Sequence, residues 1–135
     1  MTQLNAYVTF NGNCREAMTF YQACLGGELN IQTFEASPMK DQMPAEMQSN
    51  VMHSLLKKDG IVIMASDMMG PGELVRGNGT SLCIIGRNRA EIQDFFDKLS
   101  EGGTVNQPLI DTFFGTFGSL TDKFGVSWMF EADNA

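Results

Sequence analysis

Three side chains in this sequence could transfer protons near neutral pH. His53 is the only histidine, and an imidazole with its ordinary pKa could act as a general base or as a ligand. Asp67 follows the apolar segment 61–66 and could orient a substrate hydroxyl or amine, or instead cap the turn after it. Glu131 lies near the chain end and would become a base if desolvated. For each residue the alternative is an ordinary structural role, which for His53 is a half-buried strand position.

The cysteines and two adjacent phenylalanines are the other candidates for chemistry or ligand contact. Cys83 has no basic partner nearby in the sequence, so we expect it to line a binding site rather than act as a nucleophile. Cys14 follows Asn13 at the expected start of a helix, where the helix dipole would lower its pKa. Phe113 and Phe114 could form an aromatic wall for a ligand or pack in the core.

The first half of the chain contains the elements that would position these residues. Residues 4–10 are rich in aromatic and β-branched side chains, which is typical of a strand, and Asn13 with Glu16 three residues later is typical of a helix start. The helical stripe that follows consists of Ala17, Phe20, Tyr21, Cys24 and Leu25. Gly26-Gly27 would end that helix. Further strands are predicted at 29–34, 51–58 and 61–66, the last two joined by the Asp59-Gly60 turn.

The second half repeats this order. Asn88 and Glu91 lie 75 residues after Asn13 and Glu16, and strands are predicted at 80–85, 104–113, 116–121 and 126–131. We therefore predict an α+β fold made of two βαβββ modules, with module one at 1–69, a glycine-rich linker at 70–79 and module two at 80–135. Residues 36–50, which contain three methionines, fall outside the repeat and would form a lid or a surface loop.

Composition excludes several classes of protein. Nine basic against sixteen acidic residues give a net charge of −7, which disfavours nucleic-acid binding. No apolar segment approaches the roughly 18 residues of a membrane span. Three cysteines without a CxxC pair indicate neither a disulfide framework nor a zinc site, so we expect a cytoplasmic protein with reduced thiols.

Six segments, in their order and spacing, resemble the vicinal-oxygen-chelate superfamily, which includes glyoxalases, bleomycin-resistance proteins and dioxygenases. Within it they are similar to the PhnB-like branch, also labelled 3-demethylubiquinone-9 3-methyltransferase-like. The segments are 7–21, 52–55, 64–67, 77–83, 96–114 and 121–129. The resemblance implies curved mixed sheets around a cavity, one helix per module on the outer face, and a homodimer.

The same resemblance implies a site for a divalent ion, with ligands on the first and last strands of each module. The matching positions here are Ala6, Met64, Ser81 and Met129. Alanine offers no ligand atom, and thioethers and a serine hydroxyl suit hard or borderline divalent ions poorly. We therefore expect neither a metal nor another cofactor.

Strand alternation predicts which side chains face the cavity, since successive residues point to opposite faces. The candidate ligand-binding residues are Val8, Met64, Ser66, Ser81, Cys83, Phe113 and Met129. Three functions fit this pattern. The first is metal-free binding of a small, neutral or cationic molecule. The second is a metal-independent enzyme that uses His53, Asp67 or Glu131 as acid or base. The third is a metal enzyme with relocated ligands such as His53 and Asp67.

Methyl transfer from S-adenosylmethionine is not expected, although the branch carries a methyltransferase label. Such enzymes ordinarily bind the cofactor at a glycine-rich turn that opens a helix in a doubly wound sheet. Here the Gly26-Gly27 and Gly102-Gly103 pairs end helices, and two short modules leave no room for that domain.

Overall fold

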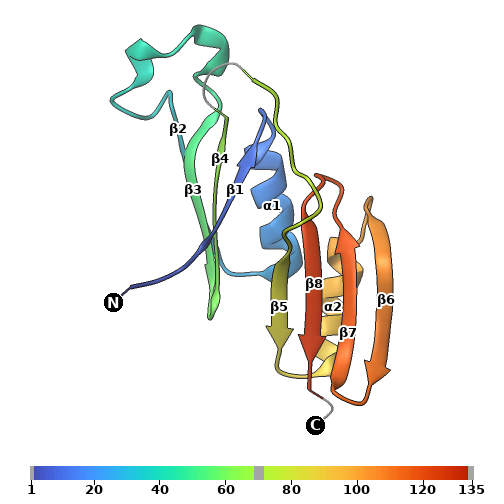
Figure 1. The fold of residues 1–135 in the computed structure, drawn as a ribbon. Coiled ribbons are helices and arrows are strands. Elements are labelled where there is room, and N and C mark those ends of the chain that lie inside the picture. The colour runs from blue at the N-terminus through green and yellow to red at the C-terminus, as the bar shows by residue number, and fades with distance from the viewer. Residues whose placement is uncertain (1, 69–71, 134–135) are drawn as a thin grey trace. The chain divides into compact units, whose positions relative to one another are not determined.

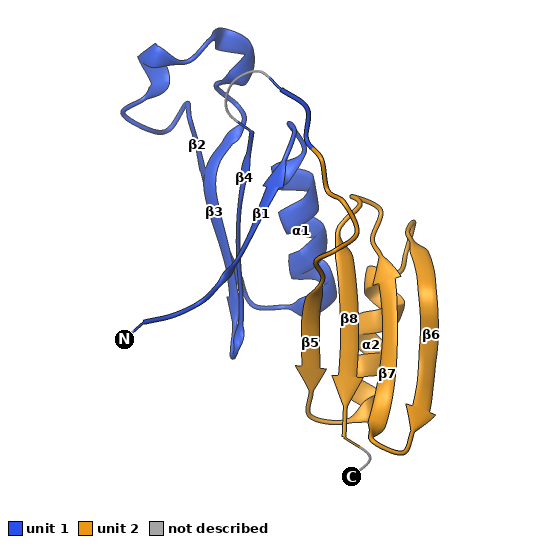
Figure 2. Cartoon of the chain, viewed as in Figure 1, with its two compact units in different colours: residues 1–74 blue, residues 75–135 orange. Residues whose placement is uncertain are grey.

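The computed structural model describes residues 2–68 and 72–133, and the chain divides into two compact units at residues 1–74 and 75–135 (Figure 2). Each unit contains one α-helix and a four-stranded sheet (Figure 1). The linker expected at 70–79 spans the boundary between the units, and its residues 70 and 71 lie outside the described part of the chain.

The first unit follows the predicted order of elements. They are β1 (Ala6–Phe10), α1 (Cys14–Leu25), β2 (Glu28–Thr33), β3 (Val51–Lys58) and β4 (Ile61–Asp67). The sheet order is β1-β4-β3-β2, with β1 parallel to β4 and the other neighbours antiparallel. The methionine-containing segment between β2 and β3 has two 3₁₀ turns, Lys40–Gln42 and Ala45–Met47, and lies beyond the ends of those strands (Figure 1).

The second unit has the same architecture. Its elements are β5 (Leu82–Gly86), α2 (Arg89–Leu99), β6 (Thr104–Thr112), β7 (Gly115–Thr121) and β8 (Ser127–Ala132). The order β5-β8-β7-β6, again with one parallel pair, matches the first sheet strand for strand. The predicted fold of two βαβββ modules is therefore confirmed.

One face of each sheet is covered by the helix of the same unit. Helix α1 buries Ala17, Met18 and Tyr21 and contacts β2, β3 and β4. Helix α2 buries Ile92, Phe95, Phe96 and Leu99 and contacts β5 and β8. This follows from the helical stripes in the sequence, because the apolar side of each helix removes its area from water by packing on the sheet. The opposite face of each sheet, called the open face below, carries no helix of its unit.

The turn after α1 requires glycine. Gly27 has φ of +94°, and a Cβ built there would lie 2.6 Å from the carbonyl oxygen of Lys57. A side chain would therefore clash with the backbone of β3, in addition to the strain of a positive φ. The Gly26-Gly27 pair ends the helix as predicted and also lets β2 start close to β3.

The two helices begin differently. Asn88 Oδ1 accepts the backbone N–H of Glu91 at 2.9 Å, so the predicted cap of α2 is confirmed. Asn13 makes no side-chain cap bond to α1, so that predicted cap is wrong. Asp67, at the end of β4, takes the role instead and accepts the N–H of Cys14 at 3.0 Å. Neither α-helix among the described residues has the length and hydropathy of a membrane span.

Candidate functional site

The open face of the first sheet is defined by β4, whose side chains alternate in exposure. Ile63, Ala65 and Asp67 are buried on the side of α1, at 3%, 0% and 2% exposure. Met64 and Ser66 lie between them in the strand and are half-buried on the open face. The face predicted for Met64 and Ser66 agrees with this alternation.

The side chains of β1 face the opposite sides of the sheet from those that alternation predicted. Tyr7 is in register with Met64 and is 53% exposed, whereas Val8 is in register with Ala65 and is 7% exposed. The open-face position predicted for Val8 is therefore wrong, and Ala6, in register with Ile63, also points to the helix side. Tyr7 takes the place that the alternation had given to Val8.

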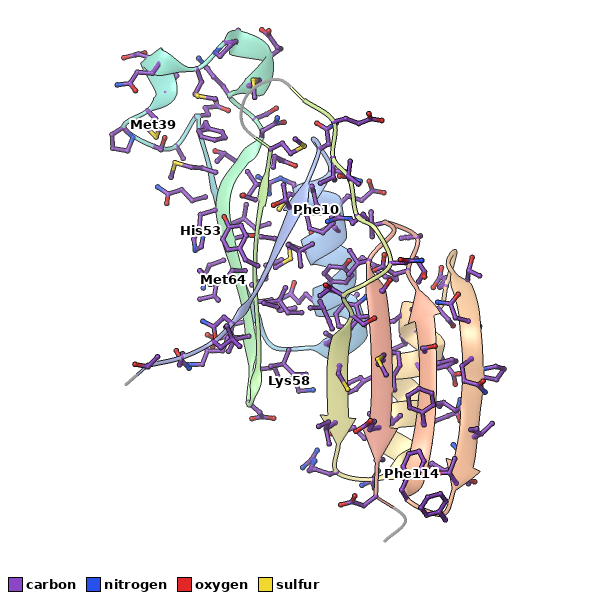
Figure 3. All side chains as sticks on the ribbon, in the orientation of Figure 1. Phe10, Met39, His53, Lys58, Met64 and Phe114 are labelled. Atoms are coloured by element: carbon purple, nitrogen blue, oxygen red, sulfur yellow. The ribbon has the colours of Figure 1, made fainter. Side chains whose placement is uncertain are left out.

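Tyr7 is part of a small polar cluster on this open face. Its hydroxyl donates a hydrogen bond to Ser66 Oγ at 2.9 Å. Its ring centroid lies 6.3 Å from that of His53, and Figure 3 shows His53 on the side of β3 away from α1. Beside it, the amide nitrogen of Asn5 lies 3.9 Å from Met64 Sδ. The cluster combines one aromatic ring, one imidazole and two hydroxyls at an exposed surface, which can contact the body of a small molecule and satisfy its polar groups.

Asp67 is not part of that cluster. Its Oδ1 accepts the N–H groups of Gly12 and Cys14 at 2.8 and 3.0 Å, and its Oδ2 accepts the N–H of Val51 at 2.8 Å. Both oxygens thus bind backbone on the helix side of the sheet. The structure gives Asp67 a folding role, and the turn it was expected to cap, which begins at Met68, is not among these partners.

Cys14 has the opposite of the predicted acidity. Its side chain is fully buried, and burial raises the pKa of the thiol to about 11, with the nearby Asp67 charge adding to the effect. Sγ lies 3.7 Å from Ser54 Oγ, which already donates its proton to the carbonyl of Ala65. The thiol is therefore the donor, and desolvation outweighs the helix dipole.

On the second sheet, the strand residues predicted to share one face do share it. Cys83 is in register with Met129, and the next open-face residue along β8, Glu131, is in register with Ile85 on one side and Phe117 on the other. Burial raises the pKa of the Cys83 thiol, and the charge of Glu131 raises it further. Cys83 therefore keeps its proton at neutral pH, as expected for a residue that lines a surface rather than a nucleophile.

The remaining predicted ligand contacts lie at the ends of strands. Ser81 is exposed immediately before β5 and is in phase with Cys83. Phe113 is 96% exposed and Phe114 57% exposed in the β6–β7 turn, with their ring centroids 5.3 Å apart in an edge-to-face arrangement. The core-packing alternative for these two rings is therefore excluded.

Asp122 has a role that the sequence analysis missed. It is 3% exposed, and its Oδ1 accepts the N–H groups of Phe124 and Val126 at 2.8 and 3.0 Å. Its Oδ2 accepts the indole N–H of Trp128 at 2.8 Å. Asp122 thus holds the β7–β8 turn as Asp67 holds the start of α1. The order Thr-Asp-Lys-Phe-Gly is a turn signal that could have predicted the backbone bonds, but not the bond to Trp128.

The residues at the superfamily's ligand positions do not fit a divalent metal. The strand registers pair Tyr7 with Met64 and Cys83 with Met129, so the first-unit counterpart of Ser81 is Asn5 rather than Ala6. These positions offer an amide and a thioether in the first unit and a hydroxyl and a thioether in the second, and such donors suit hard or borderline divalent ions poorly. Within 2–68 and 72–133, no group of three or more His, Cys, Asp or Glu side chains is placed to hold a metal ion.

The third predicted function required His53 and Asp67 to share a metal. The structure places them on opposite faces of the first sheet, and backbone N–H groups occupy both oxygens of Asp67. This pair is not a ligand set.

Two βαβββ units with these sheet orders define the class of the protein. A glyoxylase/bleomycin resistance protein/dioxygenase domain from Frankia sp. EAN1pec has the same fold, with a TM-score of 0.67 over 99% of this chain and 93% of that one. At 13% identity, this likeness shows the fold alone. The two-module fold that the resemblance implied is thus confirmed.

The family can be stated more narrowly. Residues 2–130 match the family described as 3-demethylubiquinone-9 3-methyltransferase, and the chain belongs to that family. It is 35% identical to protein YjdN of Escherichia coli (strain K12), with 93% of this chain and 92% of YjdN covered. The crystal structure of protein PA1353 from Pseudomonas aeruginosa matches with 37% identity and a TM-score of 0.88 over 98% of both chains. The PhnB protein from Bacillus cereus matches with 24% identity and a TM-score of 0.76 over 97% of this chain and 99% of that one.

Proposed function

We propose that this protein binds a small, neutral or cationic organic molecule on the open faces of its sheets, and that it does so without a metal ion. The observation that carries the proposal is the cluster of Tyr7, Ser66 and His53, which places hydrogen-bonding groups and a ring on an exposed sheet face. The net charge of −7 favours neutral or cationic ligands over anions.

A charge series on one ring tests the proposal. The full chain, labelled with ¹⁵N, is titrated with 2-phenylethanol, 2-phenylethylamine and phenylacetate, and backbone amide shifts are followed. We expect saturable shifts with the alcohol and the amine that include Tyr7, His53 and Ser66, and none with phenylacetate. If no probe shifts open-face amides, or if the anion binds best, the proposal is wrong.

The metal-free part of the proposal has its own test. Zn²⁺, Ni²⁺ and Mn²⁺ are added to protein treated with a chelator, and the melting temperature is recorded. We expect no stabilisation by any of the three ions, because the donors at the superfamily positions suit none of them. A saturable rise in melting temperature with one ion would favour the metal enzyme instead.

The metal-independent enzyme remains the second candidate, with fewer residues to support it. Both carboxylate oxygens of Asp67 accept backbone N–H groups, and Glu131 belongs to the second unit. Of the three candidate acid–base residues, His53 is therefore the one on the open face of the first sheet. A general base must reach the proton it removes, and the neighbouring Tyr7 hydroxyl donates to Ser66 instead. Conversion of a bound compound by the protein, lost in His53→Ala, would establish this candidate.

We do not propose methyl transfer, whatever the family's description. Each unit has a four-stranded sheet with one helix, and the glycine pairs follow helices instead of opening them. A doubly wound sheet with a glycine-rich turn, the usual site for such a cofactor, is a different topology. Calorimetric titration with S-adenosylmethionine is expected to show no binding heat.

The homodimer implied by the family resemblance is also part of the proposal. Phe113 and Phe114 expose two large aromatic rings at one turn, and apolar groups of this kind are typical of contact surfaces. Sedimentation velocity is expected to give the mass of two chains, and Phe113→Ser with Phe114→Ser is expected to shift it toward one. A wild-type chain that sediments as a monomer at all concentrations would contradict the dimer.

A further inference from the structure

The open face of the second sheet carries one carboxylate set in an otherwise apolar row. Across the four strands, this row runs from Ile85 on β5 through Glu131 on β8 and Phe117 on β7 to Ile110 on β6. Neighbouring strands lie about 4.8 Å apart, so the side chains of Ile85 and Phe117 flank the carboxylate directly. Ile85 is 74% exposed and Ile110 is 44% exposed, so the row is open to a ligand.

Glu131 is distinctive because the strands of this unit hold almost no charge. Within the bounds of β5, β6, β7 and β8 given above, the charged side chains are Asp111 and Glu131. Asp111 is on the helix side, in register with Thr116, and pairs with Arg89 at 3.1 Å. Glu131 is therefore the single charge that the strands place on this open face.

The cations of the second unit are engaged away from Glu131. Arg87, just before α2, pairs with Glu91 at 2.8 Å, and within the helix Lys98 pairs with Asp94 at 3.0 Å. Lys123 lies over the Phe124 ring in the β7–β8 turn, 5.5 Å from its centroid. The aliphatic part of Arg76 lies near Gly125, which precedes the first residue of β8. Glu131 is at the opposite end of β8. The carboxylate thus has no cation of its own unit beside it among the described residues.

Cys83 and Glu131 lie close enough on this open face for the carboxylate to act on the thiol. Cys83 is the open-face residue two positions before Ile85 on β5. The negative charge of Glu131 contributes to the rise in the pKa of the Cys83 thiol.

We propose that Glu131 is the counter-ion for an organic cation, an ammonium attached to an apolar or aromatic body that lies along Ile85, Phe117 and Ile110. This deepens the proposed function, on which it rests, by naming the ligand's charge and the residue that selects it. A hydrated inorganic ion would find one carboxylate between two apolar side chains, whereas an ammonium can pair with Glu131 while its body contacts the Phe117 ring.

The test compares 2-phenylethylamine with its neutral counterpart 2-phenylethanol on the full chain, by the same amide shifts. We expect the amine to bind more tightly than the alcohol and to shift amides of Ile85, Phe117 and Glu131. Glu131→Gln should weaken amine binding about threefold to tenfold and leave alcohol binding unchanged. Raising the salt from 20 to 500 mM should weaken amine binding in the wild type but not in this variant, since the ion pair is screened.

Glu101→Gln is the matched control, because it removes the same charge from an exposed position after α2. Equal loss of amine binding in both variants would show a general charge effect and overturn the inference. Equal affinities for amine and alcohol, unchanged by Glu131→Gln, would also overturn it but leave the proposed function standing. Absence of shifts on both open faces with either probe would overturn the proposed function itself.

Discussion

The carboxylate of Asp67 accepts the backbone N–H of Cys14 at 3.0 Å, although 53 residues separate the two in the chain. The same side chain holds the N–H groups of Gly12 and Val51, so one residue fixes the end of β4, the start of α1 and the start of β3. Because Asp67 is 2% exposed, these donors would find little water in its absence.

Asp67→Ala is therefore expected to destabilise the first unit strongly. Two buried N–H groups and one part-buried N–H group would lose a charged acceptor, which costs about 3 kcal/mol or more. Asp67→Asn keeps one acceptor oxygen and should cost less. Urea unfolding followed by circular dichroism measures both, with the exposed Asp133→Ala as a control. If Asp67→Ala unfolds at the wild-type urea concentration, the hydrogen bonds contribute little, contrary to this account.

Cys14 gives a second prediction, on the pH dependence of stability. The folded state raises its pKa from 9.0 to about 11, so the native protein holds this proton more tightly than the unfolded chain. The resulting stabilisation is fully present below pH 9 and is lost as the pH rises through about 11. It amounts to about 3 kcal/mol, at about 1.4 kcal/mol for each pKa unit.

The measurement is the urea midpoint of wild type and Cys14→Ala between pH 8 and 11. All other ionisable groups are the same in both proteins, so the difference between the two curves isolates the thiol. We expect the advantage of the wild type to shrink across this range. Parallel curves would mean that the thiol is not held protonated by burial.

Cys83 and Glu131 give a third prediction, on thiol reactivity. Cys83 is exposed, whereas Cys14 and Cys24 are buried, so iodoacetamide should modify Cys83 first in the native protein. Its raised pKa should make the reaction slow at pH 7.5 and faster at higher pH, because the thiolate is the reactive form. Glu131→Gln should speed it about twofold at pH 7.5, since one cause of the raised pKa is removed.

Mass spectrometry of tryptic peptides identifies the modified cysteine and its rate. Glu101→Gln again serves as the charge-matched control and should leave the rate unchanged. An unaltered rate in Glu131→Gln would show that its carboxylate does not act on the thiol, and would remove one support for the proposed ammonium site.

The fold could be predicted because its signals are local. Apolar stripes at helical spacing, glycine pairs after the helices and alternating strands gave two βαβββ modules, and each predicted strand matches an observed one to within about two residues at either end. The cap of α2 was predictable for the same reason, since Asn88 and Glu91 are close in the chain. On the second sheet, alternation also placed Cys83, Met129 and Glu131 on one face correctly.

The errors arise where distant residues or connection lengths decide the outcome. The faces of β1 were predicted by aligning the two helices, which start 75 residues apart. The equivalent strand residues Tyr7 and Cys83, which pair with Met64 and Met129, are 76 residues apart. One extra residue before α1 therefore reversed the faces of Val8 and Tyr7. The predicted cap at Asn13 is wrong, and the side chain that binds the start of the helix is Asp67 of β4, which accepts the N–H of Cys14. Local patterns contain no information on that contact.

The corrected position of Tyr7 leads to the last prediction. Tyr7→Phe removes the hydroxyl that donates to Ser66 but keeps the ring near His53. Because this hydrogen bond is exposed, its loss should change the free energy of unfolding by less than about 1 kcal/mol. Binding of 2-phenylethanol should weaken about twofold to threefold if the alcohol uses this hydroxyl pair, and Ser66→Ala should have a similar effect.

The surface variant Ser49→Ala, which removes a hydroxyl from an exposed turn of the same unit, is the control. The double variant Tyr7→Phe with Ser66→Ala should bind no more weakly than either single one, because both changes break the same hydrogen bond. Fully additive losses would mean that the hydroxyls contact the probe independently. Unchanged affinity in all variants would remove the Tyr7–Ser66 pair from the binding surface, and the proposed site on the first sheet would have to be abandoned.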